Sequence, residues 1–296
     1  MESYTSGSRR GRARLGVASL TAFALLIAVS GSAQAVAVPV PLGSANSFAV
    51  LGATEVTNSG ATVINGDIGV SPGTAVGGGY TVNGTNHGDD AVSAAAQISL
   101  DAAITSAFSQ TPPDGTISAD LGGQTLTPGI YFQAGTMLLN GGTLTLNAGG
   151  NANAVWVFQV EGDLSVNVGS TVSLIGGAQA CNVYWVSRAG TAIGGGSNFV
   201  GTIMSGTSVT FGTDANLIGR ALAATGNVTL LDNTITRPSC AVAAVPGVGG
   251  VGTGDGSTIA TGGNSYTALM AATLLLGGLG VGAAVLIRRR RIENAS

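Results

Sequence analysis

The sequence predicts a mainly β protein: a parallel β-solenoid of triangular section with one long α-helix packed along its axis. The first observation is a repeat, because similar apolar segments begin at Asn182, Gly201 and Gly219, 19 and then 18 residues apart. The second is that two further short segments follow each of these starts before the next repeat begins. The third is a single stretch of helical spacing at about 89–110, which stands apart from the repeats.

The composition indicates an extracellular β-rich protein. Only 8% of the residues are charged, against about 25% in an ordinary globular chain. Apolar residues make up 45% of the chain, which excludes a disordered glycine-rich polymer. Between residues 36 and 240, three arginines stand against eleven carboxylates, a net charge of −8. Nucleic acid is excluded as a partner of this segment, because binding to phosphates requires clustered Lys and Arg.

Residues 1–35 have the pattern of a secretory signal peptide. An arginine-rich start is followed by an apolar run from Leu15 to Val29 and by the small-residue site Ala33-Gln34-Ala35. An uncleaved membrane anchor is the alternative, and the short apolar run favours cleavage.

The other end of the chain has the pattern of a single membrane anchor. Residues 267–287 form 21 uncharged positions, long enough for a transmembrane helix. The arginine-rich tail 288–296 follows and is expected in the cytoplasm, and residues 241–266 form a flexible glycine-rich linker. We therefore expect a monomer on the extracellular face of the cell membrane. Cell-wall attachment is an alternative, although residues 258–262 keep only the Thr-Gly pair of a sorting pentapeptide.

The domain at 36–240 has three kinds of strand segment, one for each predicted face. The first segment of each repeat, such as 183–186, is apolar on both sides, so the first face that these segments form should be covered. The helix is the expected cover, since Asp89 and Asp90 favour its N-terminus. It carries a stripe of apolar residues at helical spacing: Val92, Ala96, Leu100, Ala103, Ile104, Ala107 and Phe108.

The second segment of each repeat alternates apolar and polar residues, as a half-buried strand does. The second face, formed by these segments, should therefore present a grid of short side chains to solvent. Its outward residues are Ser165, Ala192, Ser208, Thr210, Asn227 and Thr229. Thr143 and Thr145 form a secondary patch of the same kind.

Six motifs in fixed order resemble the bacterial and fungal ice-binding-like family. They lie at residues 51–53, 65–73, 126–131, 142–146 together with 153–159, 177–185 and 219–223. The resemblance covers roughly residues 42–240. It implies a discontinuous, right-handed β-solenoid in which an N-terminal part joins the body built by the rest. It also implies adsorption to ice through one flat face, without a cofactor.

The second face is the candidate ice-binding face. Regularly spaced short side chains could order surface water, with Thr143 and Thr145 as a second possible patch. A non-ice adhesin or structural envelope protein on the same fold is the alternative, because outward Thr and Ser are also ordinary strand formers. Gly194–Gly196 interrupt the grid, and Arg188 and Asp214 lie near its edges.

Catalytic residues and metal ligands are not indicated. His87 is the single histidine, which excludes a zinc site made by a pair of histidines. A polysaccharide-active enzyme is a remote alternative that would depend on carboxylates such as Glu161 and Asp163.

Cys181 and Cys240 could form a disulfide in an oxidising compartment. They are 59 residues apart, about three repeats or roughly 14 Å along the axis if the coils stack in chain order. A disulfide needs Cα atoms within about 7 Å. The bond therefore requires that the tail after Pro238 folds back, or that the coils do not stack in chain order.

Overall fold

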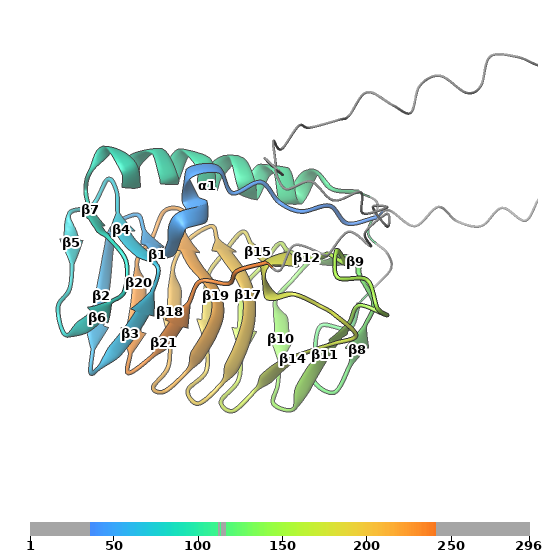
Figure 1. The fold of residues 1–296 in the computed structure, drawn as a ribbon. Helices are drawn as coiled ribbons and strands as arrows, with labels where there is room; N and C mark the ends of the chain where they lie inside the picture. The colour runs from blue at the N-terminus through green and yellow to red at the C-terminus, as the bar shows by residue number, and fades with distance from the viewer. Residues whose placement is uncertain (1–35, 112, 114–116, 241–296) are drawn as a thin grey trace, which may run out of the picture. The chain divides into compact units, whose positions relative to one another are not determined.

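A computed structural model describes residues 36–111, 113 and 117–240, which form a β-solenoid with parallel strand pairing and one long helix (Figure 1). The predicted solenoid is confirmed. The predicted signal peptide, linker, transmembrane helix and cytoplasmic tail lie outside the described residues.

Three rows of strands form the three faces. The first face contains β9 (Gly129–Gln133), β12 (Trp156–Val160), β15 (Val183–Ser187), β17 (Asn198–Ser205), β19 (Asn216–Ala223), β1 (Phe48–Gly52), β4 (Asp67–Val70) and β7 (Asn86–Gly88). The second face contains β10 (Met137–Leu139), β13 (Leu164–Val166), β16 (Thr191–Ile193), β18 (Val209–Phe211), β20 (Val228–Leu231), β2 (Glu55–Ser59) and β5 (Ala75–Val76). The third face contains β8 (Thr125–Leu126), β11 (Thr143–Asn147), β14 (Thr171–Ile175), the first halves of β17 and β19, β21 (Thr234–Thr236), β3 (Thr62–Asn65) and β6 (Tyr80–Val82).

The coils do not stack in chain order. The last coil, made of β19, β20 and β21, pairs with the N-terminal strands β1, β2 and β3, all in parallel. The N-terminal strands β1 to β7 therefore form one end of the stack, and the chain then crosses to the other end, where β8 begins. The coils that follow β8 stack back toward the N-terminal strands, and the last coil pairs with them. This discontinuity is the one that the family resemblance implied.

Helix α1 (Ala91–Ser109) is the return path between the two ends of the stack. Its 19 residues span about 28 Å at 1.5 Å per residue. Seven strand spacings separate β7 from β9, which is roughly 34 Å. The helix therefore covers most of the first face (Figure 1). Within the described ranges, it alone has the length and apolar composition of a membrane-spanning helix.

The buried side of α1 differs from the predicted stripe at its first turn. Ser93, Ala96, Leu100, Ala103 and Ala107 are buried, and the apolar ones pack in one cluster with first-face residues. The expectation that Val92 faces inward is wrong, because this residue is 44% exposed. Asp90 is the N-cap and accepts hydrogen bonds from the backbone N–H groups of Val92 and Ser93. The capping box that Ser93 completes points Ser93 inward, so Val92 faces solvent.

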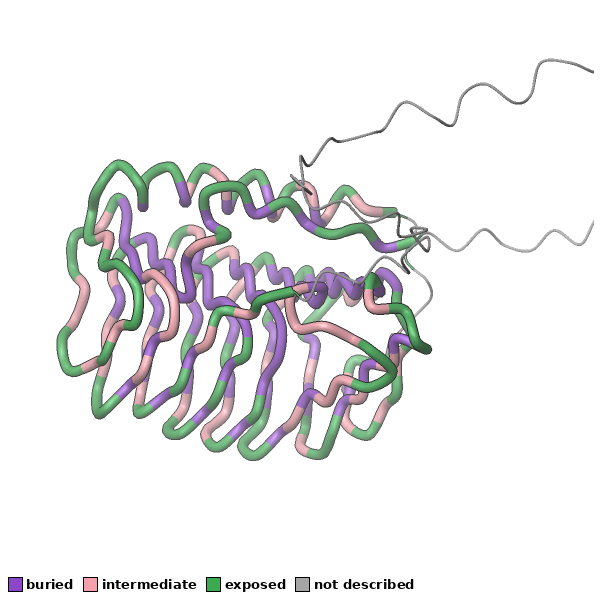
Figure 2. The backbone as a smooth tube through the Cα atoms, viewed as in Figure 1, coloured by how far each residue is buried: buried purple, intermediate pink, exposed green. Residues whose placement is uncertain are grey.

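Between the two ends of the stack, the interior of the coil is filled by alternate residues of the strands, as the buried positions in Figure 2 show. An aromatic column runs along the axis within this core. Phe158 stacks on Trp185 with ring centroids 3.8 Å apart, and Tyr131 and Phe199 extend the column at either end. Tyr131, Phe158 and Trp185 occupy matching positions on the neighbouring strands β9, β12 and β15, so coil stacking also sets the stacking of these three rings.

Candidate functional site

The second face presents a row of outward side chains at one position on six neighbouring strands. In order along the axis this central row contains Leu138, Ser165, Ala192, Thr210, Thr229 and Thr57. Neighbouring strands lie about 4.8 Å apart, so the row has a regular repeat. Four predicted residues fall in it. The sequence-based reasoning missed Thr57, whose hydroxyl partner Thr229 lies 172 residues away in the chain.

Hydrogen bonds hold one half of this face rigid. Thr229 Oγ1 accepts a hydrogen bond from Asn227 Nδ2 at 2.9 Å and another from Thr57 Oγ1 at 3.3 Å. The backbone N–H of Asn227 donates to Ser208 Oγ at 3.3 Å. These bonds connect β18, β20 and β2, and they cross the junction between the C-terminal coil and the N-terminal part. Side chains that are fixed in this way present their remaining polar groups at set positions.

The other half of the face is hollowed. A depression of about 410 Å³ lies over β10, β13, β16 and the edge of β18. It exists because the outward positions there are Ala192 of β16 and Gly190 just before that strand, between the longer side chains of Ser165 and Thr210. The expected flat grid is therefore interrupted at β16. Gly194 cannot fill the gap further along, because a Cβ there would lie 2.4 Å from the backbone nitrogen of Val168.

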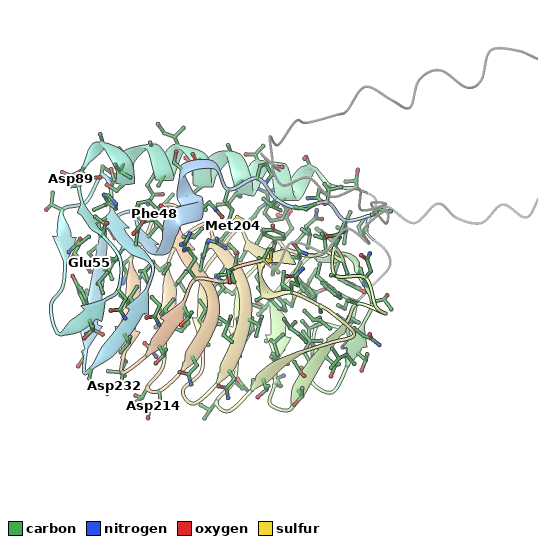
Figure 3. All side chains as sticks on the ribbon, viewed as in Figure 1. Phe48, Glu55, Asp89, Met204, Asp214 and Asp232 are labelled. Carbon is green, nitrogen blue, oxygen red and sulfur yellow. A yellow bond between two sulfur atoms is a disulfide. The ribbon has the colours of Figure 1, made fainter. Side chains whose placement is uncertain are left out.

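Carboxylates flank the central row. Asp163 and Glu55 each stand two residues before a member of the row, and Glu55 lies near the β5 end (Figure 3). Asp163 is held in place because its Oδ1 accepts a hydrogen bond from the backbone N–H of Gly190 at 2.8 Å. Asp214 lies on a loop that joins the second face to the third (Figure 3). The central row itself carries no charge.

Arg188 and Glu161 connect the edge of the second face to the helix. Arg188 Nε lies 2.7 Å from Glu161 Oε2, and its guanidinium sits 4.0 Å from the ring centroid of Phe108. Both side chains of the ion pair are partly exposed, so the pair contributes little to stability. Glu161 is thus engaged in a structural contact, as Asp163 is.

Thr143 and Thr145 lie on the third face, apart from the second-face residues. Thr143 begins a row of outward polar residues that continues with Thr171, Asn198, Asn216 and Thr234. The parallel row through Thr145 is less regular, because it reaches Ile218, which is 52% exposed. The structure therefore does not bring the two predicted patches together.

His87 lies at the start of the helix. Its Nδ1 is 2.7 Å from Asp90 Oδ2, and this hydrogen bond is the main reason why the pKa of Asp90 is lowered from its ordinary value. The ring also packs against Phe48. Among the described residues, no group of three His, Cys, Asp or Glu side chains is placed to hold a metal ion. His87 therefore has a structural place beside the helix cap.

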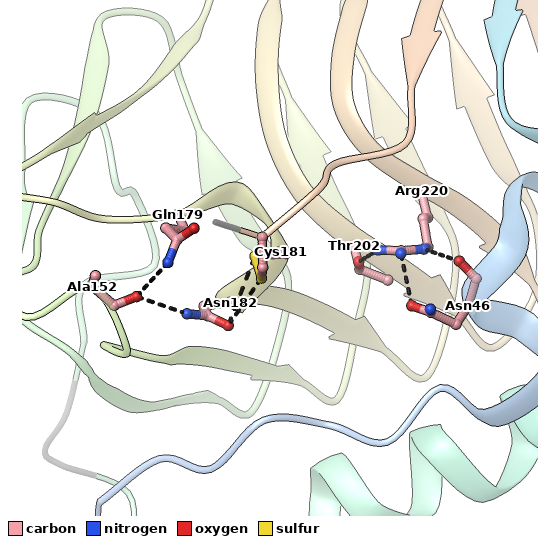
Figure 4. The surroundings of a disulfide bond; sticks show 8 residues. Asn46, Ala152, Gln179, Cys181, Asn182, Thr202 and Arg220 are labelled. Atoms are coloured by element: carbon pink, nitrogen blue, oxygen red, sulfur yellow. Dashed lines mark hydrogen bonds between the residues drawn. A yellow bond between two sulfur atoms is a disulfide. The ribbon is translucent and has the colours of Figure 1, made fainter. Parts of the chain in front are cut away.

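Cys181 and Cys240 form a disulfide with Cα atoms 5.7 Å apart (Figure 4). Cys181 belongs to the short 3-10 helix η2 (Ala180–Asn182) before β15. After β21 the chain turns along the axis and crosses the stack toward η2, as the orange segment in Figure 1 shows. Of the two conditions that the sequence left open, the tail that folds back brings the cysteines together.

A buried arginine beside this tail holds the N-terminal segment on the solenoid (Figure 4). Arg220 is 4% exposed and donates hydrogen bonds to the carbonyl and side-chain oxygens of Asn46 and to Thr202 Oγ1. Asn46 belongs to η1 (Gly43–Ser47). Burial lowers the pKa of Arg220 to about 10, so its charge is retained at neutral pH.

Comparison with known proteins identifies several that are similar to this chain in sequence and in structure. Residues 50–236 match the family described as Ice-binding-like. An ice-binding protein of a Nostoc species is 38% identical over 199 residues, which cover 66% of this chain and 73% of that protein. An ice-binding protein of Flavobacterium frigoris is 34% identical over 215 residues, covering 67% and 76%. The crystal structure of an ice-binding protein from an Antarctic biological consortium superposes with a TM-score of 0.68 at 42% identity, covering 69% of this chain and 93% of that one.

Proposed function

This chain belongs to the ice-binding-like family, and from that premise we propose that it is an ice-binding protein that adsorbs to ice through its second face. The observation that carries the choice of face is the uncharged row Thr210, Thr229 and Thr57 in continuous strand register. Thr229 Oγ1 accepts hydrogen bonds from Thr57 and Asn227, which fix Thr229 and Thr57, and the strand register sets Thr210 at the same spacing. The first face is unsuitable, because α1 covers it.

Rigid placement is what such a surface needs. Liquid water competes for every single hydrogen bond, so one hydroxyl group contributes little net free energy. A repeating array that is already ordered can hold a layer of water molecules without further loss of side-chain entropy. The relatives compared above are ice-binding proteins and not enzymes, and the proposed activity requires no catalytic residue and no cofactor.

Substitution by tyrosine tests the face directly. We expect Thr210→Tyr and Thr229→Tyr each to remove most of the inhibition of ice recrystallisation, because a ring that projects from the row keeps ice off its neighbours. Thr145→Tyr on the third face is the matched control and should leave the activity unchanged. Circular dichroism and a melting curve for each variant would show that the fold is retained.

The outcomes separate the alternatives. Loss of activity in Thr145→Tyr alone would move the site to the third face. A folded wild-type protein without any effect on ice growth would overturn the proposal and favour a non-ice adhesin or structural envelope protein.

The proposal extends to the location of the protein. We infer that residues 1–35 direct export and that 267–287 anchor a monomeric protein on the outer side of the cell membrane. The disulfide supports an exported location, because such bonds persist in oxidising compartments. Fractionation of cells, followed by protease treatment of intact cells, tests the location.

We also infer that the coil is right-handed, as are about 98% of crossovers between parallel strands.

A further inference from the structure

The last strand of the solenoid, β21, is short and would be the first to detach if the chain that follows it were pulled. It has three residues and lies between β19 and β3, so it joins the C-terminal coil to the N-terminal part on the third face. The buried side chain of Asn233, just before it, donates to the carbonyl oxygens of Gly212 and Ala215 at 2.8 and 3.1 Å. Its backbone N–H donates to Thr62 Oγ1 at 3.0 Å. Removal of β21 would open the third face of the stack at this junction.

The disulfide moves the exit of the chain away from this strand. Beyond Thr236, the backbone N–H of Arg237 still donates to the Asn65 carbonyl at 3.0 Å. The chain then runs back along the axis to Cys240, which is bonded to Cys181. Cys181 lies two residues before the start of β15, which pairs with β12 over five residues and with β17 over four. Cys240 is thus bonded to a residue that lies in the middle of the stack and not at the end of β21.

We propose that the Cys181–Cys240 disulfide is a mechanical clamp, which delivers tension from the C-terminal segment to β15 and keeps that tension off β21. Fifty-six residues follow Cys240, so a pull on the chain's end reaches the solenoid through this point. Without the bond, the pull would act on the end of β21 and break its hydrogen bonds one after another. With the bond, the pull must displace a strand that is paired on both edges and covered by α1.

A second consequence concerns the junction itself. The Thr229–Thr57 contact on the second face crosses the same boundary that β21 closes on the third face. Detachment of β21 would therefore expose the Thr229–Thr57 contact to the pulling force. A force that is applied at Cys181 does not act on this boundary. The clamp does not depend on what the second face binds.

Single-molecule pulling on the full chain tests the clamp. One handle is an azide-bearing amino acid in place of Ala192, an exposed position after β15, and the other handle is attached behind Ser296. In the oxidised protein, at most the 11 residues from Cys181 to Ala192 can be released from the solenoid between the handles. After reduction, the 48 residues from Ala192 to Cys240 become available. We expect the first rupture to shift to lower force after reduction and to begin with the release of β21.

The variant Asn233→Ala distinguishes a clamp from a bond that only limits extension. It weakens the attachment of β21, so it should lower the first rupture force of the reduced protein and leave that of the oxidised protein unchanged. Comparing the same molecules before and after addition of reductant avoids reliance on a cysteine variant that fails to fold. Equal first rupture forces in both states, or an equal effect of Asn233→Ala in both, would overturn the proposal. Neither readout involves ice, so the result is independent of the proposed function.

Discussion

Ala192→Thr should increase the activity on ice, because Ala192 is the gap in the central row. The uninterrupted polar part of the row runs over β18, β20 and β2, two strand spacings or about 10 Å. A threonine at position 192 would connect Ser165 to Thr210. The row would then cover four spacings, about 19 Å, which doubles its length.

The cost to the fold should be small. Ala192 is exposed on a strand whose neighbours leave a hollow, so an added hydroxyl and methyl group meet no close atom of the core. Threonine also suits a strand better than alanine, on a scale that spans about 1 kcal/mol. We expect an unchanged or slightly raised melting temperature, together with higher thermal hysteresis at equal protein concentration.

The control for this prediction is Ile218→Thr, which adds the same residue type to the third face at a position 52% exposed. It should leave thermal hysteresis unchanged. If Ala192→Thr retains the fold and its activity does not rise, continuity of the row is not what limits adsorption. A rise in Ile218→Thr of the same size would refute the assignment to the second face.

Three further predictions concern stability. Leu100→Ala, at a fully buried position between α1 and the first face, should lower the free energy of unfolding in urea by about 2–5 kcal/mol. Ile98→Ala, at a position 73% exposed on the same helix, is the control and should leave this free energy almost unchanged. Equal losses in the two variants would contradict the packing of α1. Replacing Cys181 and Cys240 by serine opens a loop of 59 residues and should lower the free energy of unfolding by about 4 kcal/mol; a variant as stable as the oxidised protein would argue against the bond. The pKa of Asp90 is lowered in the folded state by its hydrogen bond to His87, so its contribution to stability is present above the ordinary value of 3.8 and is lost as the pH falls through the lowered value. Melting curves of wild type and Asp90→Asn between pH 6 and 2 test this, and wild type should lose more of its stability than the variant.

Local patterns in the sequence were sufficient to predict which residues face inward and which face outward. The alternation Leu164-Ser165-Val166 allows one orientation on a half-buried strand, and the apolar first segments require a cover. The helix was predicted in the same way, from the helical spacing of its apolar residues. Its first turn did not, because the capping box of Asp90 and Ser93 outweighs the apolar character of Val92.

Tertiary structure alone decided which strands are neighbours. The strands of one face share one pattern, so nothing local in β2 or β20 indicates that they pair, and the partners Thr57 and Thr229 are 172 residues apart. The hollow at β16 arises from the side chains on both sides of Ala192, and the disulfide arises from a tail that crosses several coils. The sequence by itself therefore determined the coil and its faces, because those depend on each residue's preference for burial. The stacking order determined the continuity of the polar row and the attachment of the C-terminus, because those depend on contacts between segments far apart in the chain.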